Sequence, residues 1–187
     1  GFQATRKVID LRGTLDESTL AVCLVSGGGS AIFVAPGEGI LLAEKQKLTS
    51  LLLRCGAPIE ELNTVRKHIS RVKGGRLAEI LYPARVISLI LSDVVGDPLD
   101  IIASGVTSPD GSTYSDAMAI LEKYRLLPEV PPSILGLLER GVRGLAPETP
   151  KPGDWVFARV DNLIIGSNRL ALDAARERAA GLGFAAE

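Results

Sequence analysis

The sequence has little of what would suggest a metal, redox or nucleic-acid function. Its 187 residues include two cysteines and one histidine, and Cys23 and Cys55 lie in apolar segments without a C-x-x-C spacing. This favours buried cysteines over a metal or redox site, and nothing requires an oxidising compartment. The formal net charge of −1 gives no basic field for nucleic acid or an anionic membrane. We therefore expect a small-molecule ligand whose charge is met by local groups.

Long apolar runs are also missing. None approaches the roughly 20 residues needed to span a bilayer, and the first residues show no signal-peptide pattern, so we expect a cytoplasmic protein. Hydrophobic residues make up 46% of the chain, enough for one sizeable core, and we predict a single domain over residues 1–187. The chain starts at Gly1 and stops soon after a Gly183-Phe184 step where another strand would be expected, so we interpret it as a piece of a longer protein.

Short apolar runs alternate with helical patterns along the chain. Residues 20–25, 86–91 and 162–165 are predicted strands, each followed by a polar or glycine-rich loop, and the first is expected to be buried on both faces. The predicted helices share apolar spacing of three and four residues or a proline or glycine boundary: 43–55, 60–70, 75–81, 115–124, 132–140 and an alanine-rich helix after 168. The alternation predicts a Rossmann-like, three-layer α/β/α fold with a mostly parallel sheet, and ligands gather at the carboxyl ends of such strands. The proline-rich stretch 144–154 is expected to be a surface connection.

The first strand ends in a triple glycine, Gly27 to Gly29, between Ser26 and Ser30. Consecutive N–H groups in such a loop can form a concave nest for a phosphate or carboxylate, but a tight structural turn would use the same residues. The loop matches neither the Walker A pattern nor the dinucleotide G-x-G-x-x-G pattern.

Two carboxylates, Asp93 and Asp97, follow the second strand. They could deprotonate a hydroxyl, hold Mg²⁺ or merely cap the next helix. Phosphoryl transfer needs a metal near the phosphates and a carboxylate near the attacking hydroxyl, so two acids beside a glycine nest make a coherent site.

Five basic side chains and one asparagine gather around a second glycine turn. The group is Asn63, Arg66, Lys67, His68, Lys73 and Arg76, and Gly74-Gly75 is expected to offer free N–H groups at a helix start. A solvated charged face would look similar, and the single histidine is more often packed than catalytic. Residues 103–110 add a hydroxyl-rich loop that either donates hydrogen bonds to a ligand or makes local turns.

Taken in order, these segments resemble class II (MOFRL-associated) glycerate 2-kinases over nearly the whole chain from about Ala4. The matching stretches are 26–31, 56–59, 63–70, 73–78, 91–97, 102–105, 148–151 and 165–168. The resemblance implies transfer of the ATP γ-phosphoryl group to the 2-hydroxyl of D-glycerate, giving 2-phosphoglycerate, with Mg²⁺ as the companion ion.

The resemblance also implies site residues. Arg66 and Lys73 would neutralise charge, Asp93 would act in catalysis and Asp97 would hold the metal, although these two aspartates could exchange roles. The residues implied to bind phosphate or substrate are Ser26, Gly27, Gly28, Gly29, Ser30, Asn63, Gly74, Ser104, Gly105, Thr107 and Asn168.

This chain departs from the family pattern in ways that affect activity. Val106 stands where the family usually has proline, which should loosen the loop slightly. Family members have upstream strands with a site lysine and a second, C-terminal MOFRL-type domain, so we expect the chain alone to lack a complete active site and to have uncovered sheet edges. A hydroxypyruvate reductase, a non-catalytic anion-binding module and a kinase for a related hydroxy acid are the alternatives, and the oligomeric state, including a homodimer, is left open.

Overall fold

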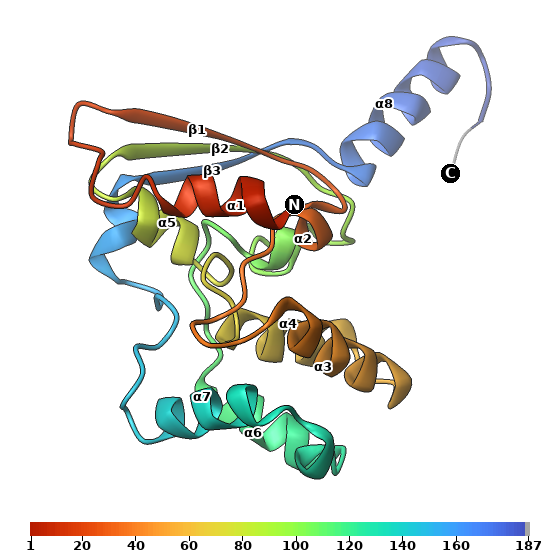
Figure 1. The fold of residues 1–187 in the computed structure, drawn as a ribbon. Coiled ribbons are helices and arrows are strands. Elements are labelled where there is room, and N and C mark those ends of the chain that lie inside the picture. Colours follow the sequence, from red (N-terminus) through yellow and green to blue (C-terminus); the bar gives the residue numbers. More distant parts are fainter. Residues whose placement is uncertain (186–187) are drawn as a thin grey trace.

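The computed structural model describes residues 1–185, built on a small parallel sheet (Figure 1). Its strands are β1 (Leu20–Val25), β2 (Arg85–Leu91) and β3 (Val160–Gly166), in the order β1-β2-β3 with both pairings parallel. Valine, leucine and isoleucine dominate these segments and suit a pleated surface. Because the strands are parallel, the loops after all three meet at one edge of the sheet. The α/β class and the parallel sheet predicted from the sequence are confirmed.

Two helices, α1 (Phe2–Ile9) and α5 (Arg76–Leu81), lie beside the sheet in Figure 1. Leu77 and Leu81 of α5 pack with Val86 of β2 and with Val106. The prediction that β1 is buried on both faces is wrong for the face turned away from α5. Leu20, Val22 and Leu24 are exposed, Leu24 to 80%. This face is therefore uncovered by residues 1–185.

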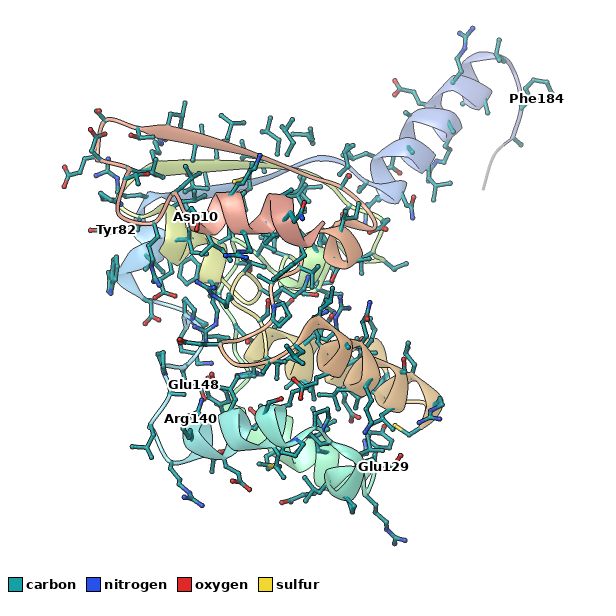
Figure 2. All side chains as sticks on the ribbon, viewed as in Figure 1. Asp10, Tyr82, Glu129, Arg140, Glu148 and Phe184 are labelled. Carbon is teal, nitrogen blue, oxygen red and sulfur yellow. The ribbon has the colours of Figure 1, made fainter. Side chains whose placement is uncertain are left out.

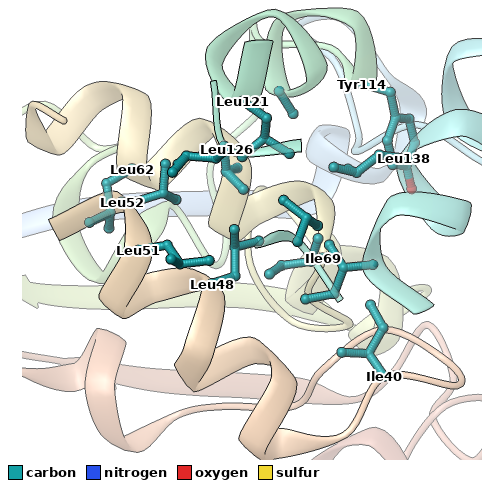
Figure 3. Close-up of a cluster of buried hydrophobic side chains, with 14 residues drawn as sticks. Ile40, Leu48, Leu51, Leu52, Leu62, Ile69, Tyr114, Leu121, Leu126 and Leu138 are labelled. Atoms are coloured by element: carbon teal, nitrogen blue, oxygen red, sulfur yellow. The ribbon is translucent and has the colours of Figure 1, made fainter. Parts of the chain in front are cut away.

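A second group of helices forms the main core, away from the sheet (Figures 1 and 3). Its members are α3 (Leu42–Arg54), α4 (Ile59–His68), α6 (Tyr114–Lys123) and α7 (Pro132–Val142). Leu48 and Leu52 of α3 face Leu121 of α6 and Leu138 of α7, and all four side chains are fully buried. The apolar spacing in each helix creates one buried stripe, and the four stripes meet.

Local signals set where several helices begin. The α6 helix starts with a capping box, in which the Asp116 N–H donates to Thr113 Oγ1 over 3.2 Å and the Thr113 N–H donates to Asp116 Oδ2 over 2.8 Å. The Glu44 carboxylate accepts from the Leu41 N–H at the start of α3. The α7 helix begins at a proline, which needs no N–H partner there.

The remaining elements connect these two parts. They are the short helix α2 (Gly29–Ile32), the 3₁₀ turns η1 (Ile102–Ser104), η2 (Leu127–Glu129) and η3 (Trp155–Arg159), and the terminal helix α8 (Asn168–Gly181). The α8 helix has no buried residue and extends away from the other elements (Figure 1). None of the described helices is long and apolar enough to cross a membrane.

The predicted elements all exist, with ends shifted by a few residues, but α1 and α2 were not predicted. The connection 144–154 is not wholly on the surface, because Thr149 and Pro150 are buried and the Thr149 hydroxyl donates to Asp110 over 3.0 Å. Glu187, where the chain is interpreted as cut from a longer protein, lies outside the described residues.

Candidate active site

The glycine loop and the carboxylate loop lie against each other at the carboxyl edge of the sheet. A Cβ atom added to Gly27 would overlap the Asp93 carboxylate, so these two residues are in direct contact. Asp93 itself is exposed. Gly28 has φ of 76°, the left-handed conformation that favours glycine, and it begins the short helix α2. Asp93 reaches the glycine loop because β1 and β2 are adjacent and parallel, so that the loops following these strands are neighbours.

Ser30 is the centre of the site. Lys73 Nζ donates to its carbonyl oxygen over 2.9 Å and to its hydroxyl over 3.0 Å. Arg66 Nη2 donates to the same carbonyl over 3.1 Å and to the same hydroxyl over 2.6 Å. Two cationic side chains thus converge on one neutral residue of the glycine loop.

A chain of hydroxyl and amide groups extends this junction. The Ser30 and Ser104 hydroxyls lie 2.8 Å apart, and the Ser104 hydroxyl donates to Asn63 Oδ1 over 3.0 Å. Arg66 Nη1 donates to the same amide oxygen over 3.4 Å. We call Ser30, Asn63, Arg66, Lys73 and Ser104 the Ser30 junction, and all five were predicted from the sequence.

The two basic side chains of this junction lack a counter-ion within residues 1–185, where neither Arg66 nor Lys73 has a carboxylate partner. Arg66 Nε is buried without any hydrogen-bond acceptor. Burial, reinforced by Arg66 and Lys45, lowers the pKa of Lys73 to about 6. Since a buried charge is costly without a counter-ion, this arrangement favours binding of an anion.

Lys45 is a member of this cationic group that the sequence analysis missed. It is only 7% exposed, and burial and the Arg66 charge lower its pKa to about 8. A signal was present, because Lys45, Leu48 and Leu52 follow each other at helical spacing and so share the buried stripe of α3.

The predicted cation cluster is divided by the structure. Lys67 forms ion pairs with Asp100 over 3.4 Å and with the buried Asp110 over 3.3 Å. His68 Nε2 lies 3.1 Å from a Glu148 oxygen. The side chains of Lys67 and His68 therefore take part in internal contacts away from the Ser30 junction.

The prediction that Gly74 and Gly75 offer free N–H groups is wrong. The Gly74 N–H donates to the Ser104 carbonyl over 3.0 Å, and the Gly75 N–H donates to the Gly105 carbonyl over 2.7 Å. Both glycines have positive φ and are tightly surrounded, so they hold the 104–105 loop against α5. The backbone of Gly74 and Gly105 thus helps to hold Ser104, a member of the Ser30 junction, in place.

Four other predicted residues lie outside the Ser30 junction. The Thr107 hydroxyl is buried between β2 and β3, where it accepts from Ser88 over 2.9 Å and donates to Asn162 over 2.7 Å. Asp97 and Asn168 instead line a separate cavity between the loop after β2 and the start of α8. Ser26 lies at the end of β1, where its carbonyl accepts the Gly29 N–H over 3.1 Å.

Backbone strain is concentrated in the loops of this edge. Asp97, Ala103 and Ser104 have φ of 54°, 51° and 61°, which is uncommon for residues with a side chain. Such conformations persist where the surrounding structure enforces them, and they cluster at functional sites. Ser104 is held by its bonds to Ser30 and Asn63.

Comparison with known proteins assigns this chain to a family. Residues 1–139 match the family model described as "Domain of unknown function (DUF4147)". The chain is 47% identical over 186 residues to the D-glycerate 2-kinase of Thermotoga maritima, covering 100% of this chain and 42% of that protein. These similarities confirm the resemblance indicated by the sequence motifs.

Solved structures agree with the sequence comparison. The crystal structure of the Thermotoga maritima glycerate kinase superposes with a TM-score of 0.86 at 47% identity, covering 100% of this chain and 42% of that one. The PH0495 protein of Pyrococcus horikoshii superposes with a TM-score of 0.88 at 43% identity, covering 98% and 41%. The chain thus spans about two fifths of the length of the relatives it matches.

Proposed function

The chain belongs to the DUF4147 family, and from this premise we propose that it carries the phosphoryl-transfer site of an ATP-dependent glycerate 2-kinase. The substrate is D-glycerate and the product is 2-phosphoglycerate. The 2-hydroxyl oxygen forms a bond to the γ-phosphorus of ATP, the bond from that phosphorus to the β–γ bridging oxygen breaks, and ADP leaves. The hydroxyl proton passes to a carboxylate.

The observation that carries this proposal is the convergence of Arg66 and Lys73 on Ser30, beside a glycine loop in contact with Asp93. Phosphoryl transfer depends mainly on positioning and on stabilising charge spread over the phosphoryl oxygens. In the glycine loop the Gly27 and Gly28 N–H groups serve as donors, since the Gly29 N–H donates to Ser26. Arg66 and, once an anion is bound, Lys73 supply the charge. Together they fit a phosphoryl group better than either does alone.

We assign the proton-accepting role to Asp93. Its carboxylate touches the glycine loop, so a hydroxyl held beside an anion in that loop would lie within its reach. Asp97 has the metal role in this scheme, and Asn168 lines the same cavity as Asp97. Ser26, Gly28 and Gly29 complete the binding loop.

The carboxylates of this edge fit the requirements of Mg²⁺. Within residues 1–185 no three His, Cys, Asp or Glu side chains gather as a metal site. Mg²⁺ in kinases is usually bound by one or two carboxylates together with substrate phosphates, so a complete protein cage is unnecessary. When bound, the ion would supply charge that neutralises the phosphates, and Asp97 is the residue proposed to hold it.

The lowered pKa of Lys73 has a consequence for ligand binding. With a pKa of about 6, this lysine is mostly neutral at pH 7 until an anion arrives. An anion stabilises the charged form, so binding should be accompanied by proton uptake. The affinity for anions should consequently decrease as the pH rises from 6 to 8.

We further propose that the remaining length of the protein supplies upstream strands and a C-terminal MOFRL-type domain that complete the site. The relatives are more than twice as long as this chain, and one face of its sheet is exposed. The kinase is proposed to be cytoplasmic.

The test is coupled ATP turnover by the full-length protein with D-glycerate and Mg²⁺, with identification of the phosphorylated product. Asp93→Asn should lower kcat by about 10²- to 10⁴-fold, the usual contribution of a general base. Asp97→Asn should raise the Mg²⁺ concentration required for activity. Asp10→Asn is the matched control, since Asp10 is an exposed residue at the end of α1 (Figure 2).

The alternatives give different results. Binding of anions without turnover in the full-length protein would favour an anion-binding module. A change in nicotinamide absorbance with hydroxypyruvate would favour a reductase. Turnover unaffected by both aspartate changes would refute the site assignment.

A further inference from the structure

A second cavity lies beside α5. It has a volume of about 490 Å³, is partly open to solvent, and is lined mainly by α1, α5, the start of α6, α7 and residues 145–147. It therefore lies between the sheet with its two helices and the main helical core, which are separate groups in Figure 1. The cavity shares no lining residue with the Ser30 junction.

The cavity carries an excess of positive charge. Four arginines line it, against two glutamates: Arg12, Arg71, Arg76 and Arg140 against Glu38 and Glu79. Arg12 and Glu79 neutralise each other across 2.7 Å. Subtracting two acidic from four basic groups leaves a net charge of +2 around the cavity.

The three remaining guanidinium groups keep hydrogen-bonding capacity that the described residues do not use. Arg71 and Arg140 form no ion pair within residues 1–185. Arg76 Nη2 donates to the Pro147 carbonyl over 3.0 Å, but its Nε is buried without an acceptor. A buried donor without a partner is destabilising unless a ligand satisfies it.

The wall of the cavity is also partly apolar. Ile9, Ile80 and Leu137 line it, together with Tyr114, whose hydroxyl donates to the Pro147 carbonyl over 3.3 Å. A ligand that fits therefore has a doubly charged head group and a small apolar part.

We propose that this cavity is a second anion site, which binds a phosphate monoester carrying a small organic group. Guanidinium forks match phosphate oxygens in pairs, and a phosphate dianion balances the net charge of +2. Because Arg76 belongs to α5 and Arg140 to α7, the bound ligand links the two parts of the fold and stabilises their arrangement. The site is independent of phosphoryl transfer.

The test uses phenyl phosphate as the probe, inorganic phosphate as the head group alone and phenol as the neutral group alone. Calorimetry gives the dissociation constant for the full-length protein and its variants. Arg71→Met/Arg140→Met removes two exposed arginines of the cavity and should weaken phenyl phosphate binding at least about tenfold, as expected for lost charge-assisted contacts. Arg54→Met/Arg143→Met is the matched control, because both residues are exposed and outside the cavity.

A third variant separates this site from the Ser30 junction. Arg66→Met should leave the cavity affinity within twofold of the wild type, and melting temperatures check that all variants are folded. The proposal is overturned if the wild type does not bind phenyl phosphate, if the two double variants bind alike, or if Arg66→Met alone abolishes binding. Equal affinity for inorganic phosphate and phenyl phosphate would also refute it, since the apolar wall would then contribute nothing.

Discussion

Substitution of the three glycines after β1 offers a direct test of the site geometry. Gly27 does not have positive φ, so alanine is compatible with its backbone, but the new Cβ would overlap the Asp93 carboxylate. Asp93 is an exposed, flexible side chain that can turn away. Gly27→Ala should therefore displace the proposed base and leave the fold intact. Since a displacement of about 1 Å can lower a rate by about 10²-fold, we expect a loss of kcat of that order.

The neighbouring glycines are the controls. Gly28 has φ of +76° and open space around it, so Gly28→Ala should cost about 1–2 kcal/mol of folding free energy through backbone strain alone. At Gly29 the added Cβ would make only an ordinary contact of 3.7 Å with Ala103, so Gly29→Ala should change little. Stability is measured by urea unfolding and kcat by coupled turnover with D-glycerate.

The three variants should therefore differ in which quantity changes, kcat or the free energy of unfolding. Gly27→Ala should lower kcat with little change in stability, whereas Gly28→Ala should lower stability first. If Gly27→Ala retains kcat within twofold of the wild type, Asp93 does not act from the position seen in the structure. If Gly29→Ala is as inactive as Gly27→Ala, the loop tolerates no side chain and the argument from Asp93 fails.

Three further predictions concern stability, each followed by urea unfolding. The folded state binds the Lys73 proton with a pKa of about 6 and the unfolded state with the ordinary value of 10.5, so stability should rise with pH above 6. Lys73 should contribute a slope that approaches about 1.4 kcal/mol per pH unit between pH 6.5 and 7.5. Lys73→Met should lose this contribution and keep only the smaller one of Lys45, whose pKa is about 8; equal slopes in the two proteins would refute the prediction. Leu48→Ala empties a fully buried position of the helical core and should cost about 2–5 kcal/mol; a cost under about 1 kcal/mol would contradict the packing. Gly141→Ala would overlap the Tyr114 ring and should destabilise by about 1–3 kcal/mol, whereas Gly136→Ala in the same helix meets open space and should stabilise by up to about 1 kcal/mol.

The elements of the site could be predicted because they depend on local chemistry. The run 20–25 followed by three glycines predicts a strand and a tight loop, and the same reasoning placed Asp93 at the end of β2. Parallel pairing of adjacent strands then brings both loops to one edge. The members of the Ser30 junction belong to segments that resemble glycerate kinases and were named as candidate site residues, but their meeting around Ser30 was not predicted: Ser30, Asn63, Arg66, Lys73 and Ser104.

Other features depended on contacts between distant segments. Gly74 was expected to present a free N–H, yet that group donates to Ser104, 30 positions later in the chain. Thr107 belongs to the expected hydroxyl loop but is buried between Ser88 and Asn162. A donor's partner is decided by what lies opposite in space, which local sequence does not encode.

The sequence by itself determined the α/β class, the positions of the strands and the glycine, carboxylate and cation segments, because periodicity and turn chemistry act within a few residues. Only the tertiary structure decided which cations remain without a carboxylate partner. Lys67 is neutralised by Asp110, 43 positions away, while Arg66, its immediate neighbour in α4, points to Ser30. Adjacent residues on a helix point in directions about 100° apart, so their electrostatic roles are set by the segments that pack on each side.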